Sequence, residues 1–243
     1  MANWQDPRTT TGVNAAATAS VPRAARDAGL RSYMLSVYNY MASGVLLTGI
    51  VAMLFANSGL AEQVLATPLR WLIVLAPLGF VMAMSFGLNR MSTGTLQTLF
   101  WAFAVSMGLS MSSIFLVYTG ISIAQTFFAV TAGFVALSLY GYTTKKDLSG
   151  IGTFLIMGVV GLLVAMVINM FLQSSAMALA ISGIGVLLFA ALTAYDTQKI
   201  KSMYAHVAGT DMMGKVVIMG ALNLYLDFVN MFTFLLSFMG DRR

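Results

Sequence analysis

Long apolar stretches separated by short polar segments occupy almost the whole chain. Seven of them run for 19 to 24 residues, and they are 35–56, 71–89, 97–118, 121–142, 151–172, 176–195 and 216–239. Only the last contains a charged residue, Asp227. Each stretch reaches or approaches the roughly 20 residues that a helix needs to cross about 30 Å of hydrocarbon. Because the alternation typical of membrane-spanning strands is missing, the pattern predicts an all-α polytopic membrane protein with seven transmembrane helices.

Two boundaries between these helices depend on short turn signals. Residues 97–142 carry no charge, and only the Tyr-Thr-Gly segment at 118–120 divides them. Residues 151–195 are divided only by Gln-Ser-Ser at 173–175. A single very long helix over 97–142 is the less favoured alternative, and six spans with a re-entrant segment remain open.

The lysines and arginines predict the orientation in the membrane, because cytoplasmic segments carry an excess of them. With the N-terminus inside, three basic residues fall outside, namely Arg70, Arg242 and Arg243. The ten that fall inside are Arg8, Arg23, Arg26, Arg31, Arg90, Lys145, Lys146, Lys199, Lys201 and Lys215. We therefore expect the N-terminus in the cytoplasm and the C-terminus outside.

The composition fits a membrane protein and excludes several other classes. Hydrophobic residues make up 59% of the chain and charged residues 9%, whereas soluble domains are about 25% charged. The net charge of +5 reflects the orientation bias, and no clustered basic and aromatic face points to nucleic acid. The chain has no cysteine, which excludes disulfides, thiol catalysis and cysteine metal sites.

The polar segments outside the seven stretches predict no further domain. Residues 1–30 are rich in Ala, Thr and Arg, so we expect a disordered cytoplasmic tail in front of a transmembrane domain at 31–243. The tail lacks the continuous apolar core of a signal peptide. The single histidine, His206, lies in a polar segment that we expect to be a solvated loop.

Small residues inside the apolar stretches predict close helix packing. Gly152, Gly158 and Gly161, and Ser182 with Gly185, are spaced so that neighbouring backbones can approach in lipid. The 19 methionines are scattered, so we interpret them as core filler rather than as a soft-metal site.

The last apolar stretch carries a polar stripe. Asn223, Asp227 and Asn230 stand at i, i+4 and i+7, and Gly220 and Phe234 extend the same helix face. An Asp at the centre of a membrane helix costs roughly 2.5–3.5 kcal/mol on insertion scales, so the stripe should point into the bundle. A structural hydrogen-bond network is the alternative to a functional site, and we favour function.

A second acid, Asp196, directly follows the sixth stretch. It is either an interfacial acid that pairs with Lys199 or Lys201, or part of an inward face that includes Thr193. Because the last two helices are antiparallel, Asp196 and Asp227 approach each other. The helical rise predicts that one or two turns separate them in depth, so contact between them stays open.

Three segments carry a family resemblance. The stretch GLSMSSIFLVYTGISIAQTFFAVTAGFVALSLYGYTTKKDLSGIG at 108–152, the segment LTAYDTQKIK at 192–201 and the segment LNLYLDFVNMF at 222–232 resemble the Bax inhibitor-1 family. The resemblance covers about residues 30–240 and is closest to the bacterial inner-membrane branch.

The resemblance implies a fold in which six helices enclose the last one, and it implies a pH-sensitive calcium leak in the cell inner membrane. In that family, the acids at the positions of Asp196 and Asp227 form a paired pH sensor at the pore. A basic residue after the second helix latches to the first acid in some members, and Arg90 in GLNRMS is the candidate here. Some bacterial members also carry a glutamate in the second helix, whereas residues 71–89 hold no acid and Gly79 stands nearest to that position.

Carboxylate chemistry agrees with this implied role. Two carboxylates close together in a low dielectric do not both ionise easily, so one takes a proton and the pair titrates as a unit. A calcium ion is a hard cation that prefers oxygen ligands and can replace that proton. Asn223 and Asn230 would add amide oxygens. Two acids make a weak calcium site, which suits conduction because the ion must also leave.

Three functional hypotheses follow. The first is a cation leak channel that needs no cofactor, has calcium as the permeant ion and uses the two acids as its sensor. The second is a regulatory protein that binds membrane proteases or other membrane partners. The third, a transporter or intramembrane enzyme, is disfavoured because no paired half-repeat and no protease-type flanking pattern is seen, so we expect no enzymatic activity.

Overall fold

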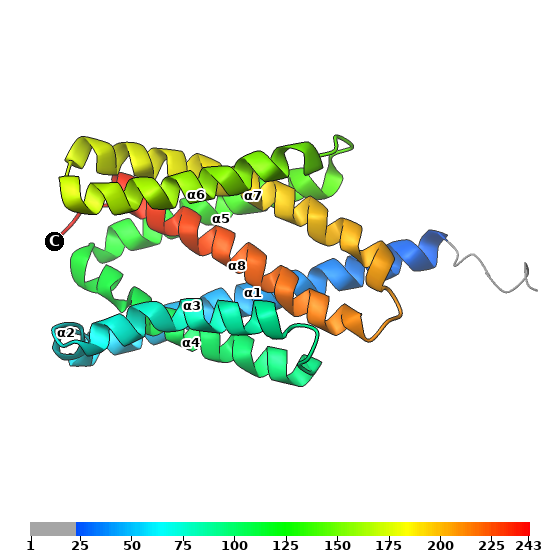
Figure 1. The fold of residues 1–243 in the computed structure, drawn as a ribbon, viewed down its shortest axis with the longest axis horizontal. Coiled ribbons are helices and arrows are strands. Elements are labelled where there is room, and N and C mark those ends of the chain that lie inside the picture. Colours follow the sequence, from blue (N-terminus) through cyan, green and yellow to red (C-terminus); the bar gives the residue numbers. More distant parts are fainter. Residues whose placement is uncertain (1–22) are drawn as a thin grey trace, which may run out of the picture.

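The computed structural model describes residues 23–243, which are almost entirely helical (Figure 1). Seven helices are long and apolar enough to cross a membrane, as the sequence predicts. An additional six-residue helix, α2, precedes the second of them. The eight helices are α1 (Arg23–Asn57), α2 (Leu60–Leu65), α3 (Leu69–Gly87), α4 (Thr93–Val117), α5 (Gly120–Thr143), α6 (Ser149–Leu172), α7 (Ser175–Val207) and α8 (Met212–Met239).

Both doubtful helix boundaries are confirmed, and hydroxyl side chains explain them. Thr119 stands between α4 and α5, and its Oγ1 accepts a hydrogen bond from the backbone N–H of Ser122 at 3.3 Å. Ser174 stands between α6 and α7, and its Oγ accepts from the N–H of Met177 at 3.3 Å. The preceding Gln173 has a φ of 50°, a left-handed conformation that ends a helix. Each cap satisfies an N–H at the start of a helix, so the chain turns at both places.

Helices α1 and α7 extend beyond the predicted apolar stretches, and the extensions pack on each other. The hydroxyl of Tyr33 donates a hydrogen bond to the carbonyl oxygen of Ile200 at 3.2 Å. The rings of Tyr33 and Tyr204 lie 5.4 Å apart. This packing stabilises turns that hydropathy alone does not predict. The expected solvated loop around His206 is therefore wrong in one respect, because the exposed His206 lies in the last turn of α7.

Only the last part of the predicted disordered tail, residues 23–30, lies within the described structure. Residues 1–22 of that prediction lie outside the described residues. Residues 23–30 belong to α1, whose first turns pack against the end of α7. Gly29 shows how close this packing is, because a Cβ there would collide with the hydroxyl group of Tyr204.

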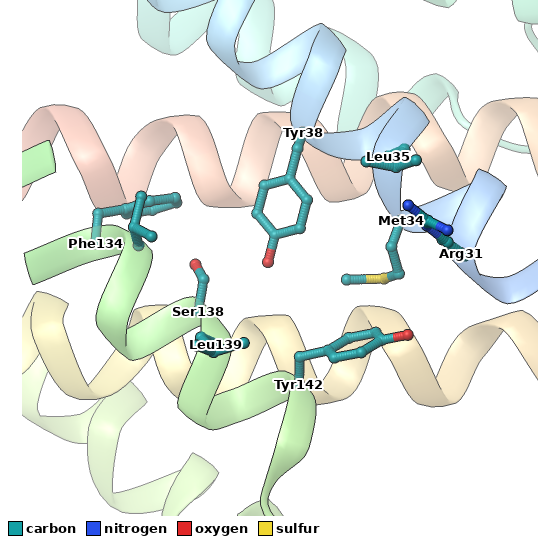
Figure 2. A pocket seen from close by; sticks show the side chains of 9 residues that line it. Arg31, Met34, Leu35, Tyr38, Phe134, Ser138, Leu139 and Tyr142 are labelled. Carbon is teal, nitrogen blue, oxygen red and sulfur yellow. The ribbon is translucent and has the colours of Figure 1, made fainter. Parts of the chain in front are cut away.

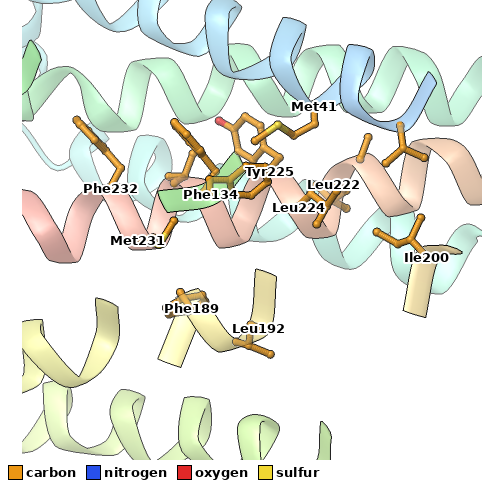
Figure 3. Close-up of a cluster of buried hydrophobic side chains, with 14 of the residues drawn as sticks. Met41, Phe134, Phe189, Leu192, Ile200, Leu222, Leu224, Tyr225, Met231 and Phe232 are labelled. Atoms are coloured by element: carbon orange, nitrogen blue, oxygen red, sulfur yellow. The ribbon is translucent and has the colours of Figure 1, made fainter. Parts of the chain in front are cut away.

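Helix α8 provides the core of the bundle. In its most apolar window, 72% of the residues are buried, against 39% for α7, the next most buried span. It packs against α1, α4, α5 and α7. Figure 3 shows apolar side chains of α8, among them Leu222, Leu224 and Met231, in the same cluster as Phe189 and Leu192 of α7. Because α8 is covered on several sides, much of its surface is buried, including Asp227.

The outer helices expose large apolar side chains. Phe86 on α3, and Phe154 and Phe171 on α6, are 81%, 73% and 78% exposed. Apolar exposure of this extent is typical of a surface that contacts lipid. The helix lengths and this surface together identify a multi-pass membrane protein.

Two of the three predicted packing glycines on α6 face α7. A Cβ at Gly152 would meet the ring of Tyr195, and a Cβ at Gly158 would meet Leu188. A Cβ at Gly161 would meet nothing within 4 Å, so this glycine does not serve helix packing. The prediction of close packing is thus confirmed at the first two positions and wrong at the third.

The topology gathers the basic segments at one end of the bundle. The start of α1 and the α3–α4, α5–α6 and α7–α8 links lie at this end, whereas the C-terminus lies at the other (Figure 1). We call the first the basic end, because within the described residues it carries Arg26, Arg31, Arg90, Lys145, Lys146, Lys199, Lys201 and Lys215. The assignment of this end to the cytoplasm stays a prediction.

Candidate functional site

Close packing of α7 on α8 sets the relative register of the two helices that carry the acids. Toward the basic end, a Cβ at Gly220 would lie 3.3 Å from Ile200. Toward the other end, a Cβ at Gly185 would lie 2.6 Å from the ring of Phe234. Both acids lie between these two contacts. The register of the antiparallel pair therefore brings them to the same level.

The carboxyl groups of Asp196 and Asp227 are neighbours on the two packed helices, close enough for each to act on the other. A hydrogen bond between two carboxyl groups requires a proton on one of them, because an ionised carboxylate only accepts. The predicted separation of one or two turns is wrong. The reason is that α7 continues for about three turns beyond Asp196, which therefore lies within the helix rather than at its end.

The two acids differ in their environment. Asp227 is only 4% exposed, and its Oδ2 atom is buried without a hydrogen-bond partner. Asp196 is half-buried. A buried polar atom without a partner is costly, and in native proteins such atoms mark strain, a missing ion or water, or a functional role. Asp227 is therefore the inner acid of the pair, and Asp196 is the one nearer to solvent.

Only one of the two lysines considered as partners of Asp196 acts on it. Lys199 interacts electrostatically with Asp196. Its Nζ also lies 5.8 Å from the centroid of the Tyr195 ring. Lys201 points elsewhere, because its Nζ donates to the carbonyl oxygen of Tyr142 at 2.6 Å. Asp196 is thus acted on by one cation and by the second acid.

Helix α5 supports α7 beside the pair. The Thr197 hydroxyl donates to the Ser138 hydroxyl at 3.4 Å. At Gly141, an added Cβ would collide with the backbone carbonyl of Ala194. These positions next to Asp196 hold it in place. Sequence reasoning did not single out Thr197, Ser138 or Gly141, since no local motif indicates a contact between helices that are distant in the chain.

The α5–α6 link is also fixed to α7. Gln198 accepts a hydrogen bond from the N–H of Leu148 at 2.8 Å and donates one to the carbonyl oxygen of Lys146 at 2.9 Å. Within the link, the Asp147 carboxylate accepts from the N–H of Ser149 at 2.9 Å. That backbone hydrogen bond holds the pKa of Asp147 below its usual value. The basic end is thus ordered around the half-buried acid.

Arg90, the candidate latch, does not reach Asp196 in this structure, and its role as a latch stays a prediction. Arg90 is exposed in the α3–α4 link, and it is not among the charged groups that act on Asp196. Lys215 donates to the carbonyl oxygen of Leu88 at 3.2 Å and so keeps this link at the start of α8. Asp227 lies roughly 18 Å further along that helix, by its rise. Arg90 stays away from the acids because it follows α3, which packs on α4 and α2 at the periphery of the bundle.

The two asparagines of the stripe are half-buried on α8. Asn230 donates through Nδ2 to the carbonyl oxygen of Leu226 on its own helix at 2.8 Å. This leaves its amide oxygen as an acceptor. Gly79, nearest to the position of the family's extra glutamate, has no neighbour within 4 Å of an added Cβ. Its place on the outer helix α3 thus adds nothing to the acid pair.

The ligand set available for a metal ion is small. Among residues 23–243, no group of three or more His, Cys, Asp or Glu side chains is placed to hold a metal ion. The two acids and the neighbouring amides are the oxygen donors of the predicted weak calcium site. A set of this size suits a transient ion better than a resident one.

A crevice of about 550 Å³ separates α1 from α5 near the pair (Figure 2). Its walls are mostly apolar, with Arg31 and Tyr142 among its lining residues. The side chains of Tyr38 and Ser138 point toward each other across it. Ser138 also accepts from Thr197, the residue that follows Asp196, so one lining residue of the crevice touches α7 next to the pair.

Comparison with known proteins identifies the family. The model of a family described as "Inhibitor of apoptosis-promoting Bax1" matches residues 30–243. Uncharacterized protein RP147 of Rickettsia prowazekii is 48% identical over 219 residues, which cover 89% of this chain and 92% of RP147. Inner membrane protein YbhL of Escherichia coli K12 is 47% identical over 221 residues, which cover 89% of this chain and 94% of YbhL. The chain therefore belongs to the Bax inhibitor-1 family of membrane proteins.

Proposed function

We propose that the protein is a pH-sensitive calcium (cation) leak channel of the bacterial inner membrane, gated by the pair Asp196 and Asp227. The observation that carries this proposal is that the two carboxyl groups are neighbours inside the bundle, on two closely packed helices. The inner-membrane location rests on the name of the relative YbhL. The proposal involves no cofactor and no catalytic residue.

The chemistry of the pair links protons to cations. With one proton shared, the two carboxyl groups attract each other and hold α7 on α8. Loss of the proton leaves two negative charges in contact, which repel strongly in a low dielectric. A divalent cation can relieve that repulsion by binding between the oxygens. Protonation and ion entry are therefore alternatives at one place, which is the property a pH-sensitive leak requires.

A purely structural hydrogen-bond network explains the site less well. Such a network satisfies its buried polar atoms, whereas Asp227 Oδ2 has no partner among the described residues. Intramembrane acids that face the interior of a bundle commonly mark ion or proton pathways. The unpaired oxygen therefore favours a site that a proton, water or ion occupies at times.

The test is a flux assay with purified protein in liposomes that contain a calcium-sensitive dye. Wild type should conduct calcium at a rate that changes with pH. Asp227→Asn and Asp196→Asn should each remove the pH dependence, because one remaining acid cannot form the pair. Asp147→Asn is the matched control, since this exposed acid lies in a link outside the pair. Its flux should follow wild type.

Two results would refute the channel. One is a complete absence of flux in correctly folded wild type. The other is a flux that is indifferent to pH and to both pair substitutions. Either would favour the alternative of a regulatory protein, to be sought by crosslinking membrane proteases or other membrane partners to the α7–α8 link.

A further inference from the structure

A second and larger cavity lies toward the end of the bundle opposite the basic end. It has a volume of about 830 Å³ and is lined by α1, α4, α5 and α8. Its lining residues include Asn57, Glu62 and Arg243, near the ends of α1, α2 and the chain. Charged side chains are costly in hydrocarbon, so a mouth that carries both signs of charge suits water rather than lipid tails. The cavity is therefore a candidate for an aqueous vestibule.

A hydrogen-bonded bridge between α1 and α8 closes one side of the inner end of this cavity. Thr48, which lines the cavity, donates its hydroxyl proton to the carbonyl oxygen of Ala104 at 2.8 Å. The hydroxyl oxygens of Thr48 and Tyr225 lie 2.7 Å apart. Because the proton of Thr48 is already used, Tyr225 is the donor in this second bond. Tyr225 is completely buried and is drawn among the core side chains of α8 in Figure 3.

Aromatic rings close the other side. Phe228 lines the cavity, and its ring centroid lies 5.7 Å from Phe127 and 5.5 Å from Phe134, both edge to face. These contacts join α8 to α5, which supplies both partners. Carbon atoms of the rings cannot replace the water molecules around an ion, and apolar constrictions of this kind block ions by excluding water.

The bridge and the rings flank the inner acid. Tyr225 and Phe228 stand two residues before and one residue after Asp227 on the same turn of α8. At this turn the bridge ties α8 to α1, and the rings tie it to α5. A path along α8 from Phe228 in the cavity lining to Asp227 therefore runs beside both contacts.

We infer that this cavity is the outer vestibule of the ion path, and that the Tyr225–Thr48 bridge together with Phe228 forms a gate between the vestibule and the aspartate pair. This inference rests on the proposed leak function. It adds a second closure that holds no titratable carboxylate, so removal of the gate and removal of the pair should have different effects. Loss of the gate raises the leak, whereas loss of the pair removes its response to pH.

The flux test uses variants that alter the gate with small changes of shape. Tyr225→Phe removes only the hydroxyl, Thr48→Val replaces the threonine hydroxyl with a methyl group, and Phe228→Ala opens the ring contacts. Each should raise calcium flux several-fold at the pH where wild type is least active, and each should keep a response to pH. Phe154→Ala is the control, because this ring lies on the exposed side of α6 and should leave flux unchanged.

The possible flux results separate the gate from the channel. If wild type conducts and all three gate variants match it, the gate is refuted and the channel stands. If wild type does not conduct, the channel itself fails. Combining Tyr225→Phe with Thr48→Val should raise flux no more than either change alone, since both break the same hydrogen bond. An additive increase would refute the bridge as a unit.

Thiol labelling tests the vestibule without any flux. The chain contains no cysteine, so single cysteines can be introduced without background. Val229→Cys lies in the cavity lining, and Ala221→Cys lies on the buried α8 surface toward the basic end. A small charged thiol reagent that does not cross membranes, applied to both faces of the liposomes, should label Val229→Cys and spare Ala221→Cys. Failure to label Val229→Cys in folded protein would refute an aqueous vestibule.

Discussion

Replacement of Asp227 by asparagine should remove most of the pH dependence of the protein's stability. The change keeps the shape of the side chain and removes one acid from the pair. In wild type, we expect the two neighbouring carboxyl groups to share one proton, because two carboxylates in a low dielectric do not both ionise easily. In the variant, the amide donates to the Asp196 carboxylate at every pH, so no proton is needed.

The magnitude follows from the contact and the burial. Two unit charges about 4 Å apart repel by roughly 4 kcal/mol at an effective dielectric constant of 20. If the pair instead keeps its shared proton, the cost is at most about 1.4 kcal/mol for each pH unit above the normal pKa of an aspartate. The free energy of unfolding of wild type should therefore fall between pH 5 and pH 9 by up to about 4 kcal/mol, the smaller of these two costs over that range. The asparagine variant should stay nearly constant over that range.

Thermal or denaturant unfolding in lipid nanodiscs, followed by tryptophan fluorescence, measures this difference. Asp147→Asn is the control. Because a backbone hydrogen bond lowers the pKa of Asp147, its contribution is complete above the normal aspartate pKa of 3.8 and is lost only at lower pH. Between pH 5 and 9 this control should shift stability equally at every pH and keep the wild-type slope. A wild-type slope that survives in Asp227→Asn would refute the shared-proton contact.

The remaining predictions concern packing, the latch and a helix cap. Gly141→Leu should destabilise the bundle by about 1–3 kcal/mol or prevent folding, because its Cβ would meet a backbone carbonyl of α7. Gly161→Leu should be tolerated, because a Cβ at that position has no neighbour within 4 Å. Urea unfolding compares the stability of the two variants. Arg90→Ala should leave calcium flux unchanged, and an increased leak would show that Arg90 reaches Asp196 in another state. Asp147→Ala should speed amide hydrogen exchange at the first turn of α6, and the difference should disappear once the pH falls below the lowered pKa of Asp147.

Hydropathy determines the spans without help from tertiary contacts. A helix in lipid must satisfy its backbone internally and needs a fixed length of apolar residues, so the seven stretches are visible in the sequence. The turn residues at 118–120 and 173–175 mark the two doubtful boundaries because their hydroxyl groups cap the next helix. The extension of α7 to Val207 is less visible, because it depends on packing against α1 through Tyr33.

The two acids of the site also differ in how far the sequence alone identifies them. Asp227 is identifiable from the sequence, because an acid amid apolar residues has an energetic cost that does not depend on the fold. The polar stripe on its helix also follows from a periodicity of 3.6 residues. Asp196 is different, since the family resemblance, rather than its own surroundings in the sequence, paired it with Asp227.

Tertiary structure alone decided which groups meet. The contact between Asp196 and Asp227 depends on the register of α7 on α8, which Gly185 and Gly220 set through their missing side chains. The bridge from Tyr225 to Thr48 joins residues far apart in the chain, and no local pattern predicts it. The sequence by itself thus determined which residues must lie inside the membrane. Their partners were decided by helix packing, because a contact between distant helices depends on rotation and depth, which hydropathy does not specify.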